Sequence, residues 1–227
     1  MAFWDGIRAL TFDCYGTIVD WETGILADLR RAGLGGTDDE LLAAYATAES
    51  RAESGEFRRY RDVLAEAAKG VAAAIGARLD ADAVFDLPSW PPFSDAPEAL
   101  RRLGLRFRLC ITSNVDRDLF LETEKRLGVR FDEVVTADVV RSYKPRPAHL
   151  HEAMRRLGLE PHEIVHVAQS LHHDVAMAKP LGIQTVWVDR RAGRSGGAVL
   201  PADAVPDLRV TSLAELVEIV ESTAERA

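Results

Sequence analysis

The sequence is poor in cysteine, has no long hydrophobic run and has no excess of positive charge. Only Cys14 and Cys110 occur among 227 residues, both in apolar stretches. A disulfide framework is therefore excluded, and a reducing cytoplasm is the expected compartment. No apolar run approaches the roughly 20 residues of a membrane-spanning helix, so no membrane partner is expected. The first residues carry an acid early and no basic segment before an apolar one, which argues against a secretory signal.

The charge balance excludes a further class of protein. Lysine and arginine number 28 against 36 aspartate and glutamate residues, a formal net charge of −8. A nucleic-acid-binding protein needs a basic patch, so no nucleic-acid partner is expected. With 47% hydrophobic and 28% charged residues, the composition is that of an ordinary globular protein. If the substrate is an anion, the chain has to gather its few useful cations at the site.

Short apolar segments alternate with helical patterns through most of the chain. Strands are predicted at Ile7–Phe12, Arg108–Thr112, Glu133–Thr136, Ile164–Ala168 and Thr185–Val188, and helices at Pro97–Leu103, Arg117–Leu127, Ala148–Leu157, Val175–Leu181 and Ser212–Val220. Strands alternating with helices predict an α/β fold, a Rossmann-like, doubly wound parallel sheet with helices on both faces. Ligands bind such sheets at the carboxyl ends of the strands.

One segment breaks this alternation. From about Thr23 to Leu87 the chain is rich in Ala, Glu and Arg, and apolar stripes at helical spacing begin at Leu41 and Val63. A proline-rich stretch from Leu87 to Phe93 ends the helical segment. The pattern predicts a helical cap domain of residues 19–93, inserted into a core domain of residues 1–18 and 94–227.

Polar clusters follow the predicted strands at four places. They are Asp13–Thr17, Thr112–Asn114, Ser142–Pro145 and Gln169–Asp174. Each has a structural explanation when taken singly, because Ser-Asn pairs occur in turns and caps, Lys-Pro pairs occur in loops, and an aspartate often caps a helix. Four such clusters at the same edge of one sheet favour a functional site.

The order Asp-x-Tyr-Gly-Thr, Ser-Asn, Lys-Pro and a late Asp resembles the haloacid dehalogenase superfamily, over essentially the whole chain, helical cap included. The resemblance implies that Asp13 is a nucleophile that forms an ester with the substrate. Phosphatases of the superfamily carry a second Asp in the first motif, which protonates the leaving alkoxide. They also carry an acidic late motif that binds Mg²⁺.

In this sequence, Tyr15 and Gln169 stand where the phosphatases carry acids. A halide leaves without a proton, and a monoanionic haloacid has less charge to neutralise than a phosphate. The chain therefore resembles the type II 2-haloacid dehalogenases, which implies a short 2-haloalkanoic acid as substrate, no metal and no cofactor. Two alternatives stay open: a Mg²⁺-dependent small-molecule phosphatase, and a catalytically weak member that binds a metabolite or a protein partner.

The resemblance also assigns roles. Lys144 is the cation nearest to Asp13 by motif order, and it is expected to lower the pKa of Asp13 and offset substrate charge. Asp174 is expected to orient Lys144 or to position the water that attacks the ester, and Thr17 is expected to assist at the catalytic centre. The residues expected to bind the substrate or the halide are Tyr15, Ser113, Asn114, Gln169 and Ser170.

The late motif departs from the dehalogenase pattern at Leu171, where those enzymes carry an Asn that helps to hold the hydrolytic water. Either Gln169, His172 or His173 compensates, or the ester is hydrolysed slowly.

The cap is expected to supply an arginine for the departing halide, aromatic residues for an apolar wall, and a surface for homodimer formation. Arg51 is favoured for the halide because it lies on the helix after Tyr45. The other arginine candidates are Arg58, Arg59 and Arg61, and the aromatic candidates are Trp21, Phe57, Tyr60 and Trp90.

Overall fold

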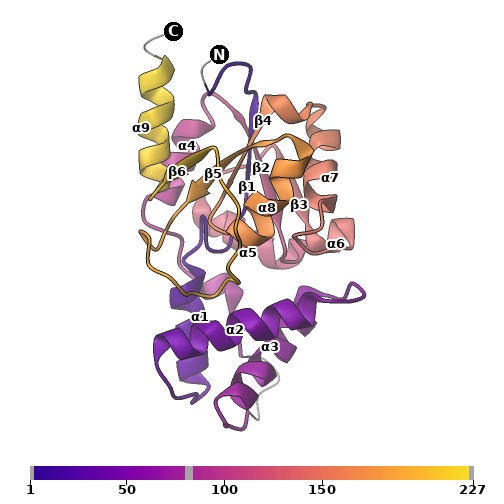
Figure 1. Cartoon of the computed structure of the whole chain (residues 1–227), viewed down its shortest axis with the longest axis vertical. Coiled ribbons are helices and arrows are strands. Elements are labelled where there is room, and N and C mark those ends of the chain that lie inside the picture. The colour runs from indigo at the N-terminus through magenta and orange to yellow at the C-terminus, as the bar shows by residue number, and fades with distance from the viewer. Residues whose placement is uncertain (1–2, 80–83, 225–227) are drawn as a thin grey trace.

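The computed structural model describes residues 3–79 and 84–224, and its centre is one parallel six-stranded sheet in the order β3-β2-β1-β4-β5-β6 (Figure 1). The strands are β1 (Ala9–Phe12), β2 (Arg108–Ser113), β3 (Glu133–Thr136), β4 (Ile164–Ala168), β5 (Gln184–Val188) and β6 (Leu208–Val210). The direction in which successive strands are added reverses beside β1, so β1 and β4 flank the switch point where such sheets bind ligands. The predicted α/β fold class is confirmed.

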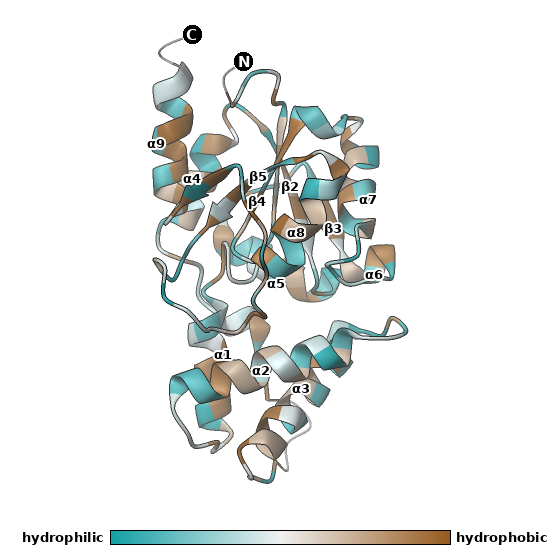
Figure 2. Cartoon of the chain, viewed as in Figure 1, coloured by the Kyte–Doolittle hydropathy of each residue, from teal (hydrophilic) through white to brown (hydrophobic). Residues whose placement is uncertain are grey.

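Helices cover both faces of the sheet, because alternate strand residues are apolar on either side. Leu10 and Phe12 of β1 pack in one cluster with α4 (Ala96–Leu103), α5 (Arg117–Leu127) and α9 (Leu213–Ala224). On the other face Ala9 packs in a second cluster with α7 (Ala148–Leu157) and α8 (Ala176–Ala178). The short helix α6 (Ala137–Val140) directly follows β3. Figure 2 shows the apolar central strands and the mixed hydropathy of the helices around them.

Three helices and a 3₁₀ turn stand between β1 and α4, at the end of the sheet away from the two termini (Figure 1). They are α1 (Trp21–Arg31), α2 (Asp38–Glu53), α3 (Tyr60–Ala74) and η1 (Leu87–Ser89). Thr37 and Glu40 form a capping box at the start of α2, which satisfies two free backbone N–H groups. This helical segment is the predicted cap, while its exact boundaries at residues 18/19 and 93/94 stay a prediction.

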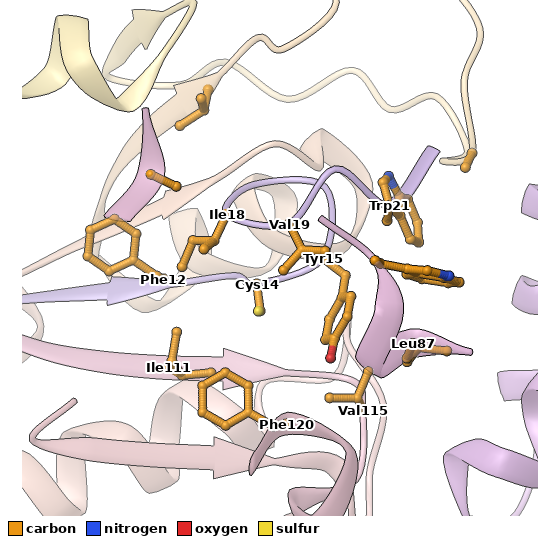
Figure 3. Packing of buried hydrophobic residues seen from close by; sticks show 14 of the residues in the cluster. Phe12, Cys14, Tyr15, Ile18, Val19, Trp21, Leu87, Ile111, Val115 and Phe120 are labelled. Atoms are coloured by element: carbon orange, nitrogen blue, oxygen red, sulfur yellow. The ribbon is translucent and has the colours of Figure 1, made fainter. Parts of the chain in front are cut away.

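The chain enters and leaves the cap through two adjacent segments. The backbone N–H of Asp20 donates to the carbonyl of Pro91 at 2.8 Å, and that of Phe93 donates to the carbonyl of Ile18 at 2.9 Å. Val19 and Pro92 form an antiparallel bridge between these bonds. The connection is thus a narrow two-stranded link. Figure 3 shows Val19 beside Tyr15, within the apolar cluster that also contains Phe12 and Ile111.

Asp28 of α1 is a buried acid that joins segments within the cap. Oδ2 of Asp28 accepts a hydrogen bond from Trp90 Nε1 at 2.9 Å and another from the backbone N–H of Asp86 at 2.7 Å. The indole of Trp90 lies directly against Gly24 of α1, and a Cβ added at Gly24 would come within 2.3 Å of the ring. Glycine at this position allows the close approach of helix and indole.

Two segments differ from the sequence-based prediction. The three-residue edge strand β6 was not predicted, since Leu208–Val210 is too short for a clear alternation and pairs only with β5. The single helix predicted at Val175–Leu181 is wrong in form. A π-helical turn, Leu171–Val175, precedes α8, and a 3₁₀ turn, Lys179–Leu181, follows it. Pro180 in this last turn cannot donate a backbone hydrogen bond to an α-helix.

In the described part of the chain, no helix combines the length and the apolar character needed to cross a bilayer.

Candidate active site

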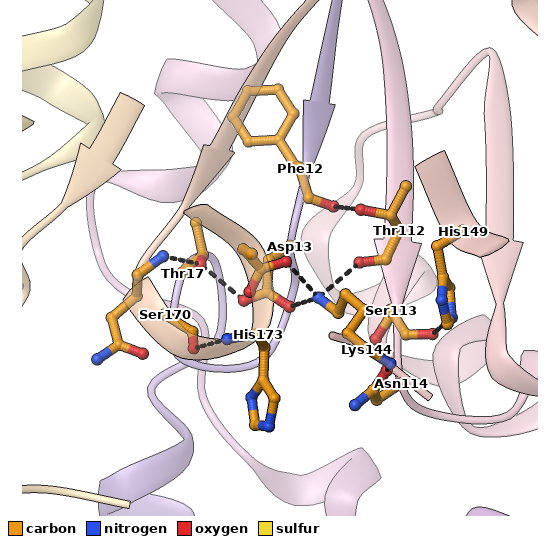
Figure 4. Close-up of polar contacts among 12 residues, drawn as sticks. Phe12, Asp13, Thr17, Thr112, Ser113, Asn114, Lys144, His149, Ser170 and His173 are labelled. Carbon is orange, nitrogen blue, oxygen red and sulfur yellow. Dashed lines mark hydrogen bonds and ion pairs between the residues drawn. The ribbon is translucent and has the colours of Figure 1, made fainter. Parts of the chain in front are cut away.

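The loops that follow β1, β2, β3 and β4 meet at the carboxyl edge of the sheet (Figure 4). Together with the cap they enclose a cavity of about 30 Å³. Of the ten residues predicted for catalysis or for binding the substrate or the halide, eight line this cavity: Asp13, Tyr15, Ser113, Asn114, Lys144, Gln169, Ser170 and Asp174. The four polar clusters identified in the sequence therefore form one site.

The centre of the site is a buried group of two carboxylates around one ammonium. Lys144 Nζ lies 2.8 Å from Asp13 Oδ1 and 2.7 Å from Asp174 Oδ1, and it also donates to the carbonyl of Thr112 at 3.2 Å. The Lys144 side chain is only 2% exposed. Asp13 follows β1 directly, so the strand end fixes its position at the switch point.

Thr17 ties the loop that follows β1 to the late motif. Its Oγ1 donates to Asp13 Oδ2 at 2.7 Å and accepts the backbone N–H of Gln169 at 2.8 Å. The intervening turn needs glycine at Gly16, where φ is +98°. A Cβ on Gly16 would lie 3.0 Å from Trp21 and 3.1 Å from Gln169. The Gly-Thr pair of the first motif thus sets both the turn and the hydrogen bond to Asp13.

A buried hydrogen-bonded chain behind Asp174 was missed in the sequence. Thr11 Oγ1 lies 2.8 Å from His166 Nδ1, and His166 Nε2 lies 3.0 Å from Asp174 Oδ1. The arrangement fits an imidazole that accepts from the threonine and donates to the carboxylate. Thr11 and His166 are paired in register on β1 and β4. Polar residues at matching positions of two otherwise apolar strands were the available signal.

The charges of the site set its pKa values. Burial raises the pKa of Asp13, while the Lys144 ammonium and the Thr17 hydroxyl act against that rise. Lys144 thus lowers the pKa of Asp13 as expected, but desolvation by burial outweighs this effect and the net shift is upward. Burial would also raise the pKa of Asp174, but Lys144 and His166 hold it below its usual value. Both carboxylates hold the pKa of Lys144 above its usual value.

The predicted binding residues have structural partners as well. The hydroxyl of Tyr15 lies 2.8 Å from Thr123 Oγ1, and burial raises its pKa. Asn114 accepts the backbone N–H of Lys144 at 2.8 Å. Ser113 Oγ accepts the N–H of Val115 and Ser170 Oγ accepts that of His173. These contacts fix the loops that form the cavity walls.

The cap contributes two buried acids that the sequence did not reveal as site residues. Glu49 and Glu53 of α2 both line the cavity and are 3% and 8% exposed. Glu49 Oε1 accepts the hydroxyls of Tyr45 at 2.8 Å and Tyr60 at 2.5 Å. Glu53 Oε1 accepts Nδ2 of Asn114 at 3.0 Å, which joins the cap to the core. Their i, i+4 spacing was a possible signal, since it places both on one helix face.

The expected cap arginine is not at the cavity. Arg51 is exposed and lines a surface groove between α2 and α3 instead. Glu49 and Glu53 lie two positions before and after Arg51 on α2, on a different face of the helix, so they turn inward while Arg51 turns outward. The other candidates bind acids elsewhere: Arg58 pairs with Glu66, Arg59 with Asp116 and Asp118, and Arg61 with Asp118. Among the lining residues that the structure describes, none is an arginine.

The expected aromatic wall is present in part. Trp21 and Tyr60 line the cavity, together with Val115 and Val199. Phe57 packs near Tyr143, with ring centroids 5.5 Å apart, and Trp90 is held inside the cap by Asp28. Trp21 and Gln169 also line a neighbouring cleft of about 520 Å³, so they form the wall between the cleft and the catalytic cavity.

The late motif places two of its three candidate compensating residues at the cavity. Gln169 and His173 line it, whereas Leu171 and His172 are not among the lining residues. Burial lowers the pKa of His173 to about 4, so its imidazole is neutral at pH 7. Gln169 Oε1 and Asp174 Oδ2 are buried and have no hydrogen-bond partner among the described residues. These acceptors are available to a bound water.

Within residues 3–79 and 84–224, no group of three or more His, Cys, Asp or Glu side chains has an arrangement suited to a metal ion. The carboxylates of Asp13 and Asp174 both pair with the Lys144 ammonium.

Comparison with known proteins gives one family. The family model for haloacid dehalogenase-like hydrolases matches residues 7–182. The (S)-2-haloacid dehalogenase of Pseudomonas sp. (strain YL) is 28% identical over 239 residues, covering 98% of each chain. The phosphoserine phosphatase of Thermus thermophilus is 32% identical over 189 residues, which cover 78% of this chain and 67% of that protein.

Solved structures show the same fold. L-2-haloacid dehalogenase from Xanthobacter autotrophicus superposes with a TM-score of 0.79 at 23% identity, over 95% of this chain and 98% of that chain. The parallel sheet and the helical cap therefore occur together in both.

Proposed function

Because the chain belongs to the haloacid dehalogenase-like hydrolase family, we propose that it is a hydrolytic dehalogenase of short 2-haloalkanoic acids. Asp13 attacks C2, the halide leaves with inversion, and water then hydrolyses the Asp13 ester to release a 2-hydroxy acid. The dehalogenase relative that spans the whole chain supports this reaction class.

The environment of Tyr15 is the observation that carries the proposal. Its phenol stands where a phosphatase needs a proton donor, but it is buried against Thr123, and burial raises its pKa. An alkoxide leaving group would receive no proton from this position, whereas a halide requires none. The first half-reaction is therefore suited to carbon–halogen cleavage.

The residues around Asp13 support both half-reactions. Lys144 and Thr17 each bond one carboxylate oxygen, which orients the nucleophile. Once one oxygen of Asp13 carries C2 of the substrate, the donor bonded to the other oxygen stabilises the charge that develops on the ester carbonyl during hydrolysis. Gln169 Oε1, Asp174 Oδ2 and the neutral His173 imidazole are the acceptors that hold the attacking water, in place of the amide missing at Leu171.

The proposal is tested by halide release from 2-chloropropionate, with and without a chelator. A single turnover in ¹⁸O-water identifies the nucleophile by mass spectrometry, since the first product oxygen comes from Asp13 and the label enters its carboxylate. Asp13→Asn should release no halide, while Asp118→Asn, an exposed acid on α5, serves as the matched control. Absence of halide from all short haloacids, or strict dependence on Mg²⁺, would contradict the proposal.

Phosphatase relatives give a reason to test a second function. A phosphatase would hydrolyse p-nitrophenyl phosphate only when Mg²⁺ is present. The same protein preparation can be assayed for this hydrolysis with and without Mg²⁺. Stabilisation of the fold by a metabolite without turnover would instead favour a binding protein.

A further inference from the structure

Two polar side chains lie inside the sheet, on strands whose other residues are apolar. Thr11 of β1 and His166 of β4 are both 0% exposed, and they are paired in register on neighbouring strands. The rest of β1 is Ala, Leu and Phe, and the rest of β4 is Ile, Val and Ala. An apolar pair of the same shape would leave no buried polar group to satisfy, so the packing of the sheet does not require this one. The reason for the pair has to lie in what it binds.

The Thr11 hydroxyl orients the ring of His166. Thr11 Oγ1 lies 2.8 Å from His166 Nδ1, and no other hydrogen bond joins this hydroxyl to a residue of the described chain. On the far side of the ring, His166 Nε2 lies 3.0 Å from Oδ1 of Asp174, a carboxylate that accepts when it is ionised. A hydroxyl that donates to Nδ1 and a hydrogen on Nε2 satisfy both contacts. The opposite tautomer would set Nε2 and the carboxylate against each other as two acceptors.

The two oxygens of the Asp174 carboxylate have different surroundings. Oδ1 accepts from His166 Nε2 at 3.0 Å and from Lys144 Nζ at 2.7 Å. Oδ2 is buried and has no hydrogen-bond partner among the described residues. A single donor could bind either oxygen as the carboxylate turns about its Cβ–Cγ bond, whereas two donors from different elements fix that turn. One oxygen therefore anchors the group, and the other is left as a free acceptor of a residue that lines the cavity.

Only the second half of the proposed reaction needs a base beside Asp13. In the first half the Asp13 carboxylate attacks C2 and the halide leaves, and neither event moves a proton. In the second half water attacks the ester and has to lose a proton, which a positioned base can accept. Asp174 and Asp13 bond the same atom, Lys144 Nζ, at 2.7 and 2.8 Å, and both line the cavity. The free oxygen of Asp174 is therefore close enough to serve the ester.

We propose that His166, held by Thr11, is a positioning residue for ester hydrolysis, because it fixes Asp174 so that Oδ2 takes a proton from the attacking water. The inference rests on the proposed displacement at Asp13 and concerns its second half. The water oxygen bonds to the ester carbonyl carbon while one water hydrogen passes to Asp174 Oδ2. The bond from that carbon to the substrate oxygen then breaks, and the departing oxygen takes the proton from Asp174. Asp13 releases the remaining proton to solvent.

The test separates the two half-reactions in His166→Met and His166→Gln, with 2-chloropropionate as substrate. Methionine fills the space without a donor, whereas the glutamine amide brings an N–H toward the position of Nε2. In His166→Met the first turnover should release halide at close to the wild-type rate, while kcat falls by about 100-fold and the ester accumulates. Rapid acid quench and mass spectrometry of the intact protein and of its Asp13 peptide detect that ester. His166→Gln should recover about tenfold of the lost kcat, because it restores a hydrogen bond to a charged group.

Threonine variants keep the test decisive if the His166 variants fail to fold. Thr11→Val removes the hydroxyl that orients the ring and should also accumulate the ester, while Thr11→Ser should hydrolyse it at close to the wild-type rate. Thr185→Val is the matched control, because buried Thr185 of β5 pairs in register with His166 from the other side but donates to Asp207. It removes a buried hydroxyl of the same kind and should accumulate no ester.

The outcomes distinguish this inference from the proposed function. If halide release and ester hydrolysis fall together in the His166 and Thr11 variants, the two residues have a structural role only. If hydrolysis is unchanged in these variants, the base is another residue such as His173. Either result overturns the inference and leaves the dehalogenase reaction in place. No halide from wild type with any short haloacid would overturn the reaction, and the inference with it.

Discussion

Lys144 Nζ lies 2.8 Å from Asp13 Oδ1 in a part of the molecule where the two side chains are 2% and 10% exposed. Taking both charges out of water costs more free energy than one pair returns unless other groups complete the hydrogen bonding. Asp174, Thr112 and Thr17 supply those groups. If Asp13 is the nucleophile, as proposed, it and Lys144 depend on one network for both activity and stability.

Lys144→Met should abolish halide release and destabilise the fold. The substitution leaves Asp13 and Asp174 buried without their common cation, and the expected loss in the free energy of unfolding is about 3–5 kcal/mol. Urea denaturation measures it. Lys125→Met removes an exposed pair with Glu122, whose side chains are 69% and 51% exposed, and should cost less than about 1 kcal/mol. Equal losses in the two variants would contradict the network.

Thr17→Val should lower kcat by about 100-fold, because it removes the hydroxyl that donates to Asp13. It also leaves the backbone N–H of Gln169 without an acceptor, at a cost of about 1–3 kcal/mol in the free energy of unfolding. Thr17→Ser keeps the hydroxyl and should recover most of both. Steady-state kinetics and urea denaturation give the two readouts. A serine variant as impaired as the valine variant would assign the effect to packing.

Glu49 should make the protein less stable as the pH rises. Burial raises the pKa of Glu49 from 4.5 to about 7. A carboxyl group whose pKa is higher in the folded state than in the unfolded state contributes its full stabilisation at pH values below the unfolded pKa. This stabilisation is lost as the pH rises through the folded pKa. Relative to Glu49→Gln, wild type should lose up to about 3 kcal/mol between pH 4.5 and 7.5.

Urea denaturation of wild type and Glu49→Gln at pH 5 and pH 8 measures this change. Glu56→Gln, at an exposed position, should follow wild type at both pH values. Parallel pH profiles for wild type and Glu49→Gln would show that Glu49 has an ordinary pKa in the folded protein.

Gly24→Ala should destabilise the protein although alanine favours helices. The added Cβ would lie 2.3 Å from the Trp90 ring, which has to move and release its bond to Asp28. Overpacking of this kind costs about 1–3 kcal/mol in the free energy of unfolding, and loss of the buried hydrogen bond between Trp90 and Asp28 adds to that cost. The higher helix propensity of alanine offsets only about 1 kcal/mol. Gly35→Ala, which meets nothing within 4 Å, is the matched control. Thermal and urea denaturation should separate the two variants, and equal stability would contradict the packing argument.

The sequence predicted the sheet well because its strands are short, apolar and bounded by polar residues. Glu133–Thr136 and Ile164–Ala168 were predicted to the residue, as were the helices Arg117–Leu127 and Ala148–Leu157. Local patterns determine such elements. The edge strand β6 depends on pairing with β5, and the turn after β4 depends on the position that Asp174 takes beside Lys144. Neither dependence is visible in a local pattern.

The core side of the candidate site could be predicted because each motif follows a strand, and parallel strands bring their ends together. The cap side could not, because a helix gives the spacing of its residues but not the face that it turns inward. Arg51 and Glu53 are two positions apart on α2, and only the packing of α2 against α3 and the core decides that Glu53 meets the cavity.

The small size of the catalytic cavity has a kinetic consequence. Its volume of about 30 Å³ has room for about two water molecules, and Trp21 and Gln169 stand between it and the neighbouring cleft of about 520 Å³. We expect a substrate that arrives from the cleft to displace these two side chains as it enters. The paired segments at Val19 and Pro92 are the natural hinge for that motion. The turnover rate is then bounded by how often the hinge opens, and added viscosity should slow it even where bond cleavage is fast.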